Sequence, residues 1–251
     1  MGLIEVTRTD GVTMVGLARP DKRNALDQAM VDELHGALDA ALAGEPSVLV
    51  LHSTTPGMFV AGADIAELIE RRADAALRSI NAGLFERLEA YRWPTIAAVD
   101  GVAFGGGCEL ALACDFRLAS PTARFAQPEL NLGILAGAGG NWRLAQVVGL
   151  QVARRMLYSG AVLDADAALA AGLVDAVHPA AELVDAAAAL ATTIGQRSWR
   201  ALELTKLALR LHRPATTTFD VAAQALLFEG DDKVTRMQAF LDRSNRPRKE
   251  S

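Results

Sequence analysis

Glu109 is the residue of this sequence whose position is hardest to explain without a chemical role. It follows three glycines, Gly105 to Gly107, and is surrounded by the apolar run 110–113. A carboxylate on such an apolar turn needs a hydrogen-bonding partner or acquires a raised pKa. A fold rarely accepts that cost without a use for it, so we expect a functional role for Glu109. The alternative is a structural carboxylate that pairs with an arginine.

A second glutamate, Glu129, follows in the segment FAQPELNLG, with one predicted strand between the two. Two segments, FVAGADI at 59–65 and the glycine triplet, each follow a predicted strand and have a backbone suited to close approach by a ligand. Together these parts could offer two backbone N–H groups and two carboxyl groups to one small chemical group. The alternative for Glu129 is a plain turn carboxylate.

Composition and charge exclude several classes of function. The 251 residues carry a formal net charge of -5, which gives no general attraction to nucleic acid or to acidic membranes. No apolar run approaches the roughly 18 residues that a membrane helix needs. The start of the chain resembles neither a secretory signal nor a transit segment. We therefore expect a cytoplasmic globular protein, with the basic tail RSNRPRKES as a frayed terminus.

Cysteine and histidine usage argues against disulfide and metal chemistry. Cys108 and Cys114 are the only cysteines, and their spacing on one helix points them to different faces. We expect both to be small buried residues in a reducing compartment. The four histidines lack metal-ligand spacing, so no metal site is expected.

The glycine-rich and serine-containing segments do not match known nucleotide-binding or serine-hydrolase motifs. GAGGNW has Trp142 where the dinucleotide fingerprint requires glycine or alanine, and no Walker sequence is present. The YSG segment at 158–160 has Leu157 where a nucleophile elbow requires glycine. Nucleotide binding and serine-hydrolase chemistry therefore have no support.

The order of elements predicts an α/β fold. The segment 11–20 alternates like a strand, 24–42 has helical spacing, and 47–53 reads as a buried strand. The core-facing side of that helix should comprise Met30, Leu34, Ala37, Leu38, Ala41 and Leu42. Strand and helix patterns alternate to about residue 180, and helices are predicted at 180–195, 198–212 and 218–243.

On these segments the sequence resembles the enoyl-CoA hydratase/isomerase (crotonase) family. The resemblance covers nearly the whole chain, in order, through RPDKRNAL, AGADI, WPTIAAVDGVAFGGGCELALACD, FAQPELNLGI, GAGGNWRL and LDADAALAAGLVD. It implies a spiral of repeated ββα units at 1–190 with the acyl-CoA site, and a helical C-terminal trimerisation region at 191–251. It also implies homotrimers or homohexamers, an acyl-CoA thioester substrate, and neither a redox cofactor nor a metal.

Carried over residue by residue, the resemblance assigns roles to both glutamates and to two backbone groups. Ala63 and Gly106 would form an oxyanion hole through their N–H groups and so polarise the thioester carbonyl. Glu109 would hold and activate the water that attacks Cβ, while Glu129 would handle the proton exchanged at Cα.

The contacts with the rest of the substrate follow from the same resemblance. Asn24, Ala25 and Leu26 resemble the segment whose backbone meets the CoA adenine, and Lys22 or Arg23 would face the phosphates. A basic loop beside a helix start is the alternative explanation for that segment. Arg243 of a neighbouring subunit is a further CoA-contacting candidate, and the remaining substrate-binding candidates are Ala61, Asp64, Ile65 and Gly137.

Both carboxyl groups favour reversible hydration of a trans-2-enoyl-CoA to a 3-hydroxyacyl-CoA, with fatty-acid β-oxidation as the expected context. The first alternative is an isomerase that moves a 3-enoyl double bond to position 2 and needs Glu129 but not Glu109. A second is a hydratase of a branched or aromatic acyl-CoA. A protein that binds RNA or acyl-CoA without turnover is disfavoured by the acidic balance and by the intact glutamates.

The chain departs from the family pattern at two places beside the predicted site. Ala136 stands where the family often has proline before the glycine that positions the water, and Asn141-Trp142 replaces a threonine-glutamine pair. We expect Trp142 to have a packing role. These changes leave room for a specialised substrate.

Overall fold

The computed structural model describes residues 2–64, 67 and 80–210. The chain divides into two compact units, of which the first ends at Gly195 and the second begins at Gln196. Among the described residues no helix has the length and hydropathy to cross a membrane. The trimerisation role expected for residues 191–251 stays a prediction.

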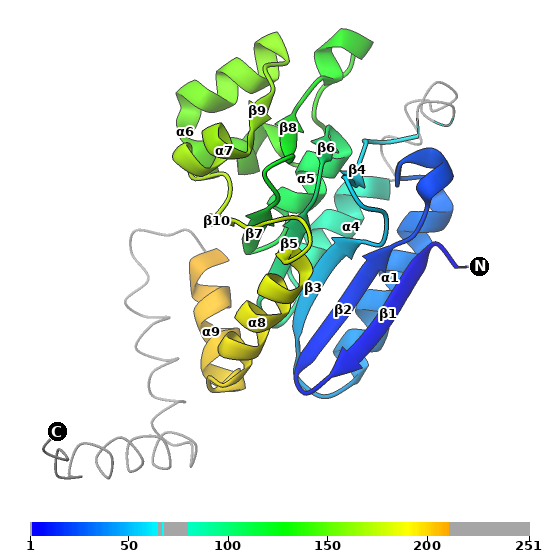
Figure 1. Ribbon diagram of the computed structural model, residues 1–251, viewed down its shortest axis with the longest axis vertical. Helices are drawn as coiled ribbons and strands as arrows, with labels where there is room; N and C mark the ends of the chain where they lie inside the picture. The colour runs from blue at the N-terminus through cyan, green and yellow to red at the C-terminus, as the bar shows by residue number, and fades with distance from the viewer. Residues whose placement is uncertain (1, 65–66, 68–79, 211–251) are drawn as a thin grey trace, which may run out of the picture. The chain divides into compact units, whose positions relative to one another are not determined.

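Strands of the first unit form two sheets (Figure 1). In the described chain the larger sheet has the order β1 (Ile4–Thr9), β2 (Val12–Leu17), β3 (Val48–Ser53), β5 (Thr95–Val99), β7 (Phe116–Ala119) and β10 (Ala176–Val177). Its β1–β2 pair is an antiparallel hairpin, and the other pairs are parallel. The smaller sheet has the order β4 (Met58–Val60), β6 (Val102–Phe104), β8 (Arg124–Ala126) and β9 (Leu163–Asp164).

Helices and two short 3-10 turns connect these strands. The described helices of the first unit are α1 (Gln28–Ala43), α4 (Ile80–Glu89), α5 (Gly106–Leu112), α6 (Gly140–Ser159), α7 (Ala165–Ala170) and α8 (Leu183–Gly195). The 3-10 turns are η1 (Pro20–Lys22) and η2 (Glu129–Leu132), and the second unit contains α9 (Trp199–Arg210).

The chain winds as a spiral in which successive turns contribute one strand to each sheet. β3, β5 and β7 lie side by side in the larger sheet, and the strands that follow them, β4, β6 and β8, lie side by side in the smaller one. Along the chain, α5 follows strands β5 and β6, and α6 follows strands β7 and β8. The expected repeat of ββα units is confirmed. It brings the segments that follow β4, β6 and β8 close together.

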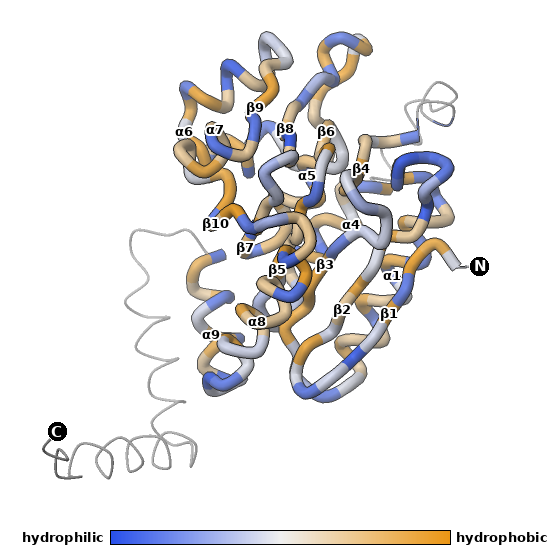
Figure 2. Tube along the Cα trace, viewed as in Figure 1, coloured by the Kyte–Doolittle hydropathy of each residue, from blue (hydrophilic) through white to orange (hydrophobic). Residues whose placement is uncertain are grey.

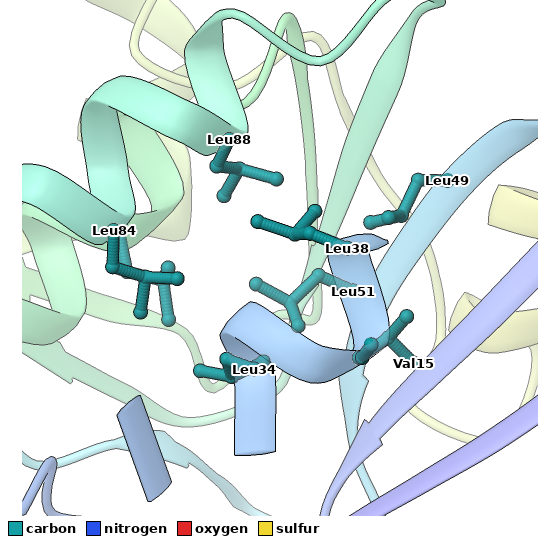
Figure 3. A pocket seen from close by; sticks show the side chains of 9 residues that line it. Val15, Leu34, Leu38, Leu49, Leu51, Leu84 and Leu88 are labelled. Atoms are coloured by element: carbon teal, nitrogen blue, oxygen red, sulfur yellow. The ribbon is translucent and has the colours of Figure 1, made fainter. Parts of the chain in front are cut away.

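Apolar side chains on both faces of the larger sheet explain why it is covered on both sides. β3 reads VLVLHS, its first four residues are buried, and it is among the most apolar stretches of the trace (Figure 2). Helix α8 contacts β2, β3 and β5 on one face. On the other face Leu49 and Leu51 meet leucines of α1, α4 and α5 around a small apolar cavity (Figure 3).

Local sequence signals account for most element boundaries. Asp27 caps α1 by accepting a hydrogen bond from the Met30 N–H at 2.8 Å, and the Asp10-Gly11 pair, with positive φ at both residues, turns the β1–β2 hairpin. The expected core face of α1 is buried except for Leu42, which is 40% exposed; its inclusion was wrong because it lies at the edge of the apolar stripe. The predicted helix 218–243 lies outside the described residues.

We expect Leu51→Ala to lower the free energy of unfolding by about 3 kcal/mol, because it removes a buried side chain beside an existing cavity. Chemical denaturation measures this change. Leu42→Ala in α1 is the control and should cost less than about 1 kcal/mol, since Leu42 is exposed. Equal losses for the two variants would contradict this account of the core.

Candidate active site

Two glycines of the triplet are required by close contacts. A Cβ on Gly105, whose φ is +50°, would stand 2.7 Å from Oε1 of Glu129. A Cβ on Gly107 would stand 2.2 Å from the backbone oxygen of Val60. At Gly107 the obstacle is backbone, and at Gly105 a side chain would be strained by the positive φ and would displace the Glu129 carboxyl group. The absence of side chains therefore lets α5 begin against β4 and against Glu129.

Gly106 differs from its two neighbours because space lies in front of it. A Cβ at Gly106 would have only ordinary contacts, 3.6 Å from the Ala63 nitrogen, 3.6 Å from Leu26 Cδ1 and 3.8 Å from Asn81 Nδ2. Gly106 is the first residue of α5, where the N–H groups have no partner within the helix. Within the described residues the Ala63 N–H makes no backbone hydrogen bond either. The structure therefore brings the two predicted oxyanion donors to one small space.

Backbone hydrogen bonds fix the segment that carries Ala63. Leu26 N–H donates to Gly62 O at 2.8 Å, and Leu26 O accepts from the Asp64 N–H at 3.1 Å. The Ala61 N–H donates to the same neighbouring loop at 3.1 Å. The Ala63 N–H lies between these bonds and is directed away from the paired segment that contains Leu26. Ala61, Leu26 and Asp64 thus have a clear role in holding the donor.

Arg19 ties the same two segments together, and sequence analysis did not single it out. Its guanidinium lies 2.7 Å from an oxygen of Asp27 and 3.2 Å from an oxygen of Asp64, and it donates to Ala25 O at 2.6 Å. The three charged side chains are between 12% and 15% exposed, so solvent screens them only partly. No local sequence pattern points to Arg19, because its partner Asp64 lies 45 residues further along the chain.

Asn24 is buried, and its side chain is used entirely within the fold. Its Nδ2 donates to Ser53 Oγ at 2.8 Å and to Phe59 O at 2.9 Å, while its Oδ1 accepts from the Arg19 N–H at 2.8 Å. Its φ of +53° places it in the left-handed region, which asparagine tolerates better than most residues. A ligand could therefore meet only its backbone, as the resemblance implies.

Glu109 lies in α5, is 4% exposed, and is held by the loop before α6 and by the first residue of α6. Its Oε1 accepts hydrogen bonds from the Ala138 and Gly140 N–H groups, each at 2.8 Å. Burial raises the pKa of Glu109, while these two N–H groups and the Arg143 charge oppose the rise. The arginine-paired alternative is wrong for Glu109, because the Arg143 guanidinium pairs with Glu89 instead.

Arg143 supports the loop that holds Glu109. Its Nη1 donates to Ala138 O at 2.9 Å, and its Nη2 lies 2.6 Å from Glu89 Oε2 at the end of α4. The guanidinium also lies 4.3 Å from the centre of the Trp142 ring. Trp142 is 44% exposed, and its ring packs against the guanidinium of the buried Arg143. This contact is the packing role expected for Trp142.

Glu129 begins η2 and is 9% exposed. Burial, together with the nearby charge of Glu109, raises its pKa to about 7. With the Gln127 amide oriented to satisfy its neighbours, Nε2 of Gln127 donates to both carboxyl oxygens at 3.1 and 3.2 Å. The other end of that amide lies against Gly140, so Gln127 stands between the two glutamates.

The remaining predicted residues lie around this centre or beyond the described chain. Lys22 and Arg23 are exposed at η1, and Gly137 is exposed in the loop before α6. Ile65 and Arg243 lie outside the described residues. Among the residues the structure describes, no cluster of histidine, cysteine and acidic side chains could hold a metal ion.

The raised pKa of Glu129 predicts a stability difference that depends on pH. Because Glu129 binds its proton more tightly in the folded than in the unfolded protein, protonation of Glu129 adds to the free energy of unfolding. This contribution is fully present below a pH of about 4.5, the pKa of Glu129 in the unfolded chain, and is lost as the pH rises through about 7. Glu129→Gln removes this loss, so its Tm relative to the wild type should be higher at pH 8 than at pH 5. Thermal unfolding at both pH values measures the difference. Exposed Glu86→Gln should show no such change, and an equal offset at both pH values for Glu129→Gln would contradict the assignment.

Comparisons with known proteins agree with this geometry. A family model described as enoyl-CoA hydratase/isomerase matches residues 7–249. The chain is 37% identical to 2,3-dehydroadipyl-CoA hydratase of Escherichia coli, covering 97% of both chains. It is 36% identical to crotonyl-CoA hydratase of Syntrophomonas wolfei, covering 96% of this chain and 95% of that protein. The crystal structure of enoyl-CoA hydratase from Bacillus anthracis superposes with a TM-score of 0.91 at 30% identity over 96% of both chains. This chain is therefore a member of the enoyl-CoA hydratase/isomerase family and has the crotonase fold.

Proposed function

We propose that this protein catalyses the reversible hydration of a trans-2-enoyl-CoA to a 3-hydroxyacyl-CoA. The observation that carries the proposal is a pair of buried carboxyl groups with different environments beside two converging backbone N–H groups. Oε1 of Glu109 accepts two N–H hydrogen bonds, and Glu129 has a pKa of about 7. The pair can thus hold one proton near neutral pH.

The space in front of Gly106 suits the thioester carbonyl oxygen. Negative charge must flow onto that oxygen before Cβ of the conjugated enoyl group becomes electrophilic. Hydrogen bonds from the Ala63 and Gly106 N–H groups would stabilise this charge, and each such donor is worth about 3 to 4 kcal/mol. The positive end of the α5 dipole adds to the effect.

The two glutamates would then divide the elements of water. Glu109 accepts a proton from the water as its oxygen bonds to Cβ, and Glu129 delivers its own proton to Cα. The Cα–Cβ double bond becomes single, and the product carries a hydroxyl at Cβ. After the reaction the proton lies on Glu109 in place of Glu129, so one proton remains on the pair throughout.

Names of the relatives support hydration without deciding the acyl group. The E. coli relative is named for a dehydroadipyl group and the S. wolfei relative for a crotonyl group, although both are similarly identical to this chain. Within this proposal, fatty-acid β-oxidation as the context, trimers or hexamers as the assembly, and the absence of a cofactor stay predictions.

Gly106→Ala should strongly lower activity without harming the fold. Its Cβ would have only ordinary contacts, yet it would occupy the space before the Ala63 N–H that the thioester oxygen needs. We expect kcat/KM for crotonyl-CoA to fall about 100-fold or more. Tm should stay near the wild-type value, because alanine is the better helix former. Retained activity in this folded variant would contradict the oxyanion hole.

Replacing each glutamate separately distinguishes hydratase from isomerase. We expect Glu109→Gln to lower the hydration of crotonyl-CoA about 1,000-fold, measured as loss of the conjugated enoyl-thioester absorbance. Isomerisation of a 3-enoyl-CoA, which needs Glu129 but not the water held by Glu109, would be largely spared. Glu129→Gln should lose both activities. If the wild type leaves crotonyl-CoA unchanged and converts only the 3-enoyl-CoA, the protein is an isomerase.

A further inference from the structure

Asn81 is a partly buried polar residue that the proposed chemistry does not use. It lies in the first described turn of α4, and its Oδ1 is buried without a hydrogen-bond partner among the residues the structure describes. The apolar face of the same helix is formed by Leu84, Phe85 and Leu88, all buried. An unpaired carboxamide oxygen beside such a face weakens the fold, so something else should account for its presence.

The carboxamide of Asn81 borders the space of the oxyanion hole. Its Nδ2 lies 3.8 Å from the position that a Cβ on Gly106 would take, and the same position is 3.6 Å from the Ala63 nitrogen. A thioester whose oxygen is held by Ala63 and Gly106 would therefore bring the atoms bonded to its carbonyl carbon close to Asn81. In the proposal below, the atoms that approach Asn81 are those of the acyl chain.

The chemistry of a carboxamide defines what could satisfy it. Its oxygen accepts and its nitrogen donates hydrogen bonds, so a hydroxyl group can interact with either end. A plain aliphatic acyl chain offers neither a donor nor an acceptor beyond the thioester. Such a chain would leave Oδ1 as unsatisfied in the complex as it is in the free protein.

We propose that Asn81 is a specificity-determining residue that selects enoyl-CoA substrates with a hydroxyl group on the acyl chain near the double bond. The inference rests on the proposed hydratase function and deepens it by naming a substrate class. The hydroxyl donates to Oδ1, and the complex thereby gains a bond that the unsubstituted substrate cannot form. A site built to hydrogen-bond a substrate hydroxyl discriminates strongly against the analogue that lacks it.

A matched pair of substrates tests this proposal. Crotonyl-CoA and trans-4-hydroxy-2-butenoyl-CoA differ only by one hydroxyl on the carbon after the double bond. We expect the wild type to favour the hydroxylated substrate by about ten-fold or more in kcat/KM. Asn81→Leu keeps a similar side-chain volume and should lose this preference. Its kcat/KM should fall for the hydroxylated substrate and stay unchanged for crotonyl-CoA, while Tm stays at or above the wild-type value.

Gly83→Ala on the same helix is the control, because a Cβ there meets no atom within 4 Å. It should leave both rates unchanged. Equal losses of kcat/KM on both substrates for Asn81→Leu would overturn the proposal. They would mean that the Asn81 carboxamide hydrogen-bonds the pantetheine amide, which both substrates share, or another group of the protein. An unchanged preference in Asn81→Leu would overturn it as well.

Failure of the proposed function would be separately visible. If the wild type hydrates neither substrate, the hydratase proposal fails, and binding is measured instead by calorimetry with butyryl-CoA and 4-hydroxybutyryl-CoA. Tighter binding of the hydroxylated compound by the wild type but not by Asn81→Leu would support the role of Asn81. Equal binding of the two compounds by the wild type would overturn it.

Discussion

The hydrogen bonds from the Ala138 and Gly140 N–H groups to Oε1 of Glu109 are the constraint on which the rest of the site depends. A carboxylate cannot be buried in an apolar helix unless such donors replace the water it loses. One donor comes from the loop before α6 and the other from the first residue of α6, both far from Glu109 in sequence, and the loop is held in turn by Arg143 through Ala138 O. Because Arg143 is itself paired with Glu89 of α4, three helices contribute to placing one oxygen.

Close backbone approach is the second physical requirement, and it explains why the site is built largely from residues without side chains. Gly105 and Gly107 remove atoms that would collide with Glu129 and Val60, whereas Gly106 leaves space that nothing in the described fold fills. On the opposite side, the loop that contains Asn24 and Leu26 is hydrogen-bonded to the segment of Ala63. The Ala63 and Gly106 N–H groups are therefore held in place by the fold itself, as the proposed oxyanion hole requires.

Several buried polar groups of the site are held at a cost in stability. Glu129 has a pKa of about 7 because burial and the charge of Glu109 disfavour its ionised form, and the same effect lets it keep a proton near neutral pH. Asn81 keeps a buried oxygen unpaired beside the oxyanion space. Such groups occur where function competes with stability. The apolar contacts of β3 with α1, α4 and α5 supply the compensating rigidity, because they fix the helices from which Glu109 and Asn81 project.

The sequence by itself indicated alternating strands and helices, because their periodicity and the glycine triplet are local signals, and the spiral followed from its resemblance to the crotonase family. It also identified Glu109 and Glu129, since an acidic residue in an apolar segment is visible without coordinates. Only the tertiary structure decided how they are held. The donors to Glu109, the clamp formed by Arg19 and the unpaired Asn81 depend on contacts between residues remote in the chain. Periodicity reports which face of an element is apolar, but not which backbone groups from other turns of the spiral will meet it.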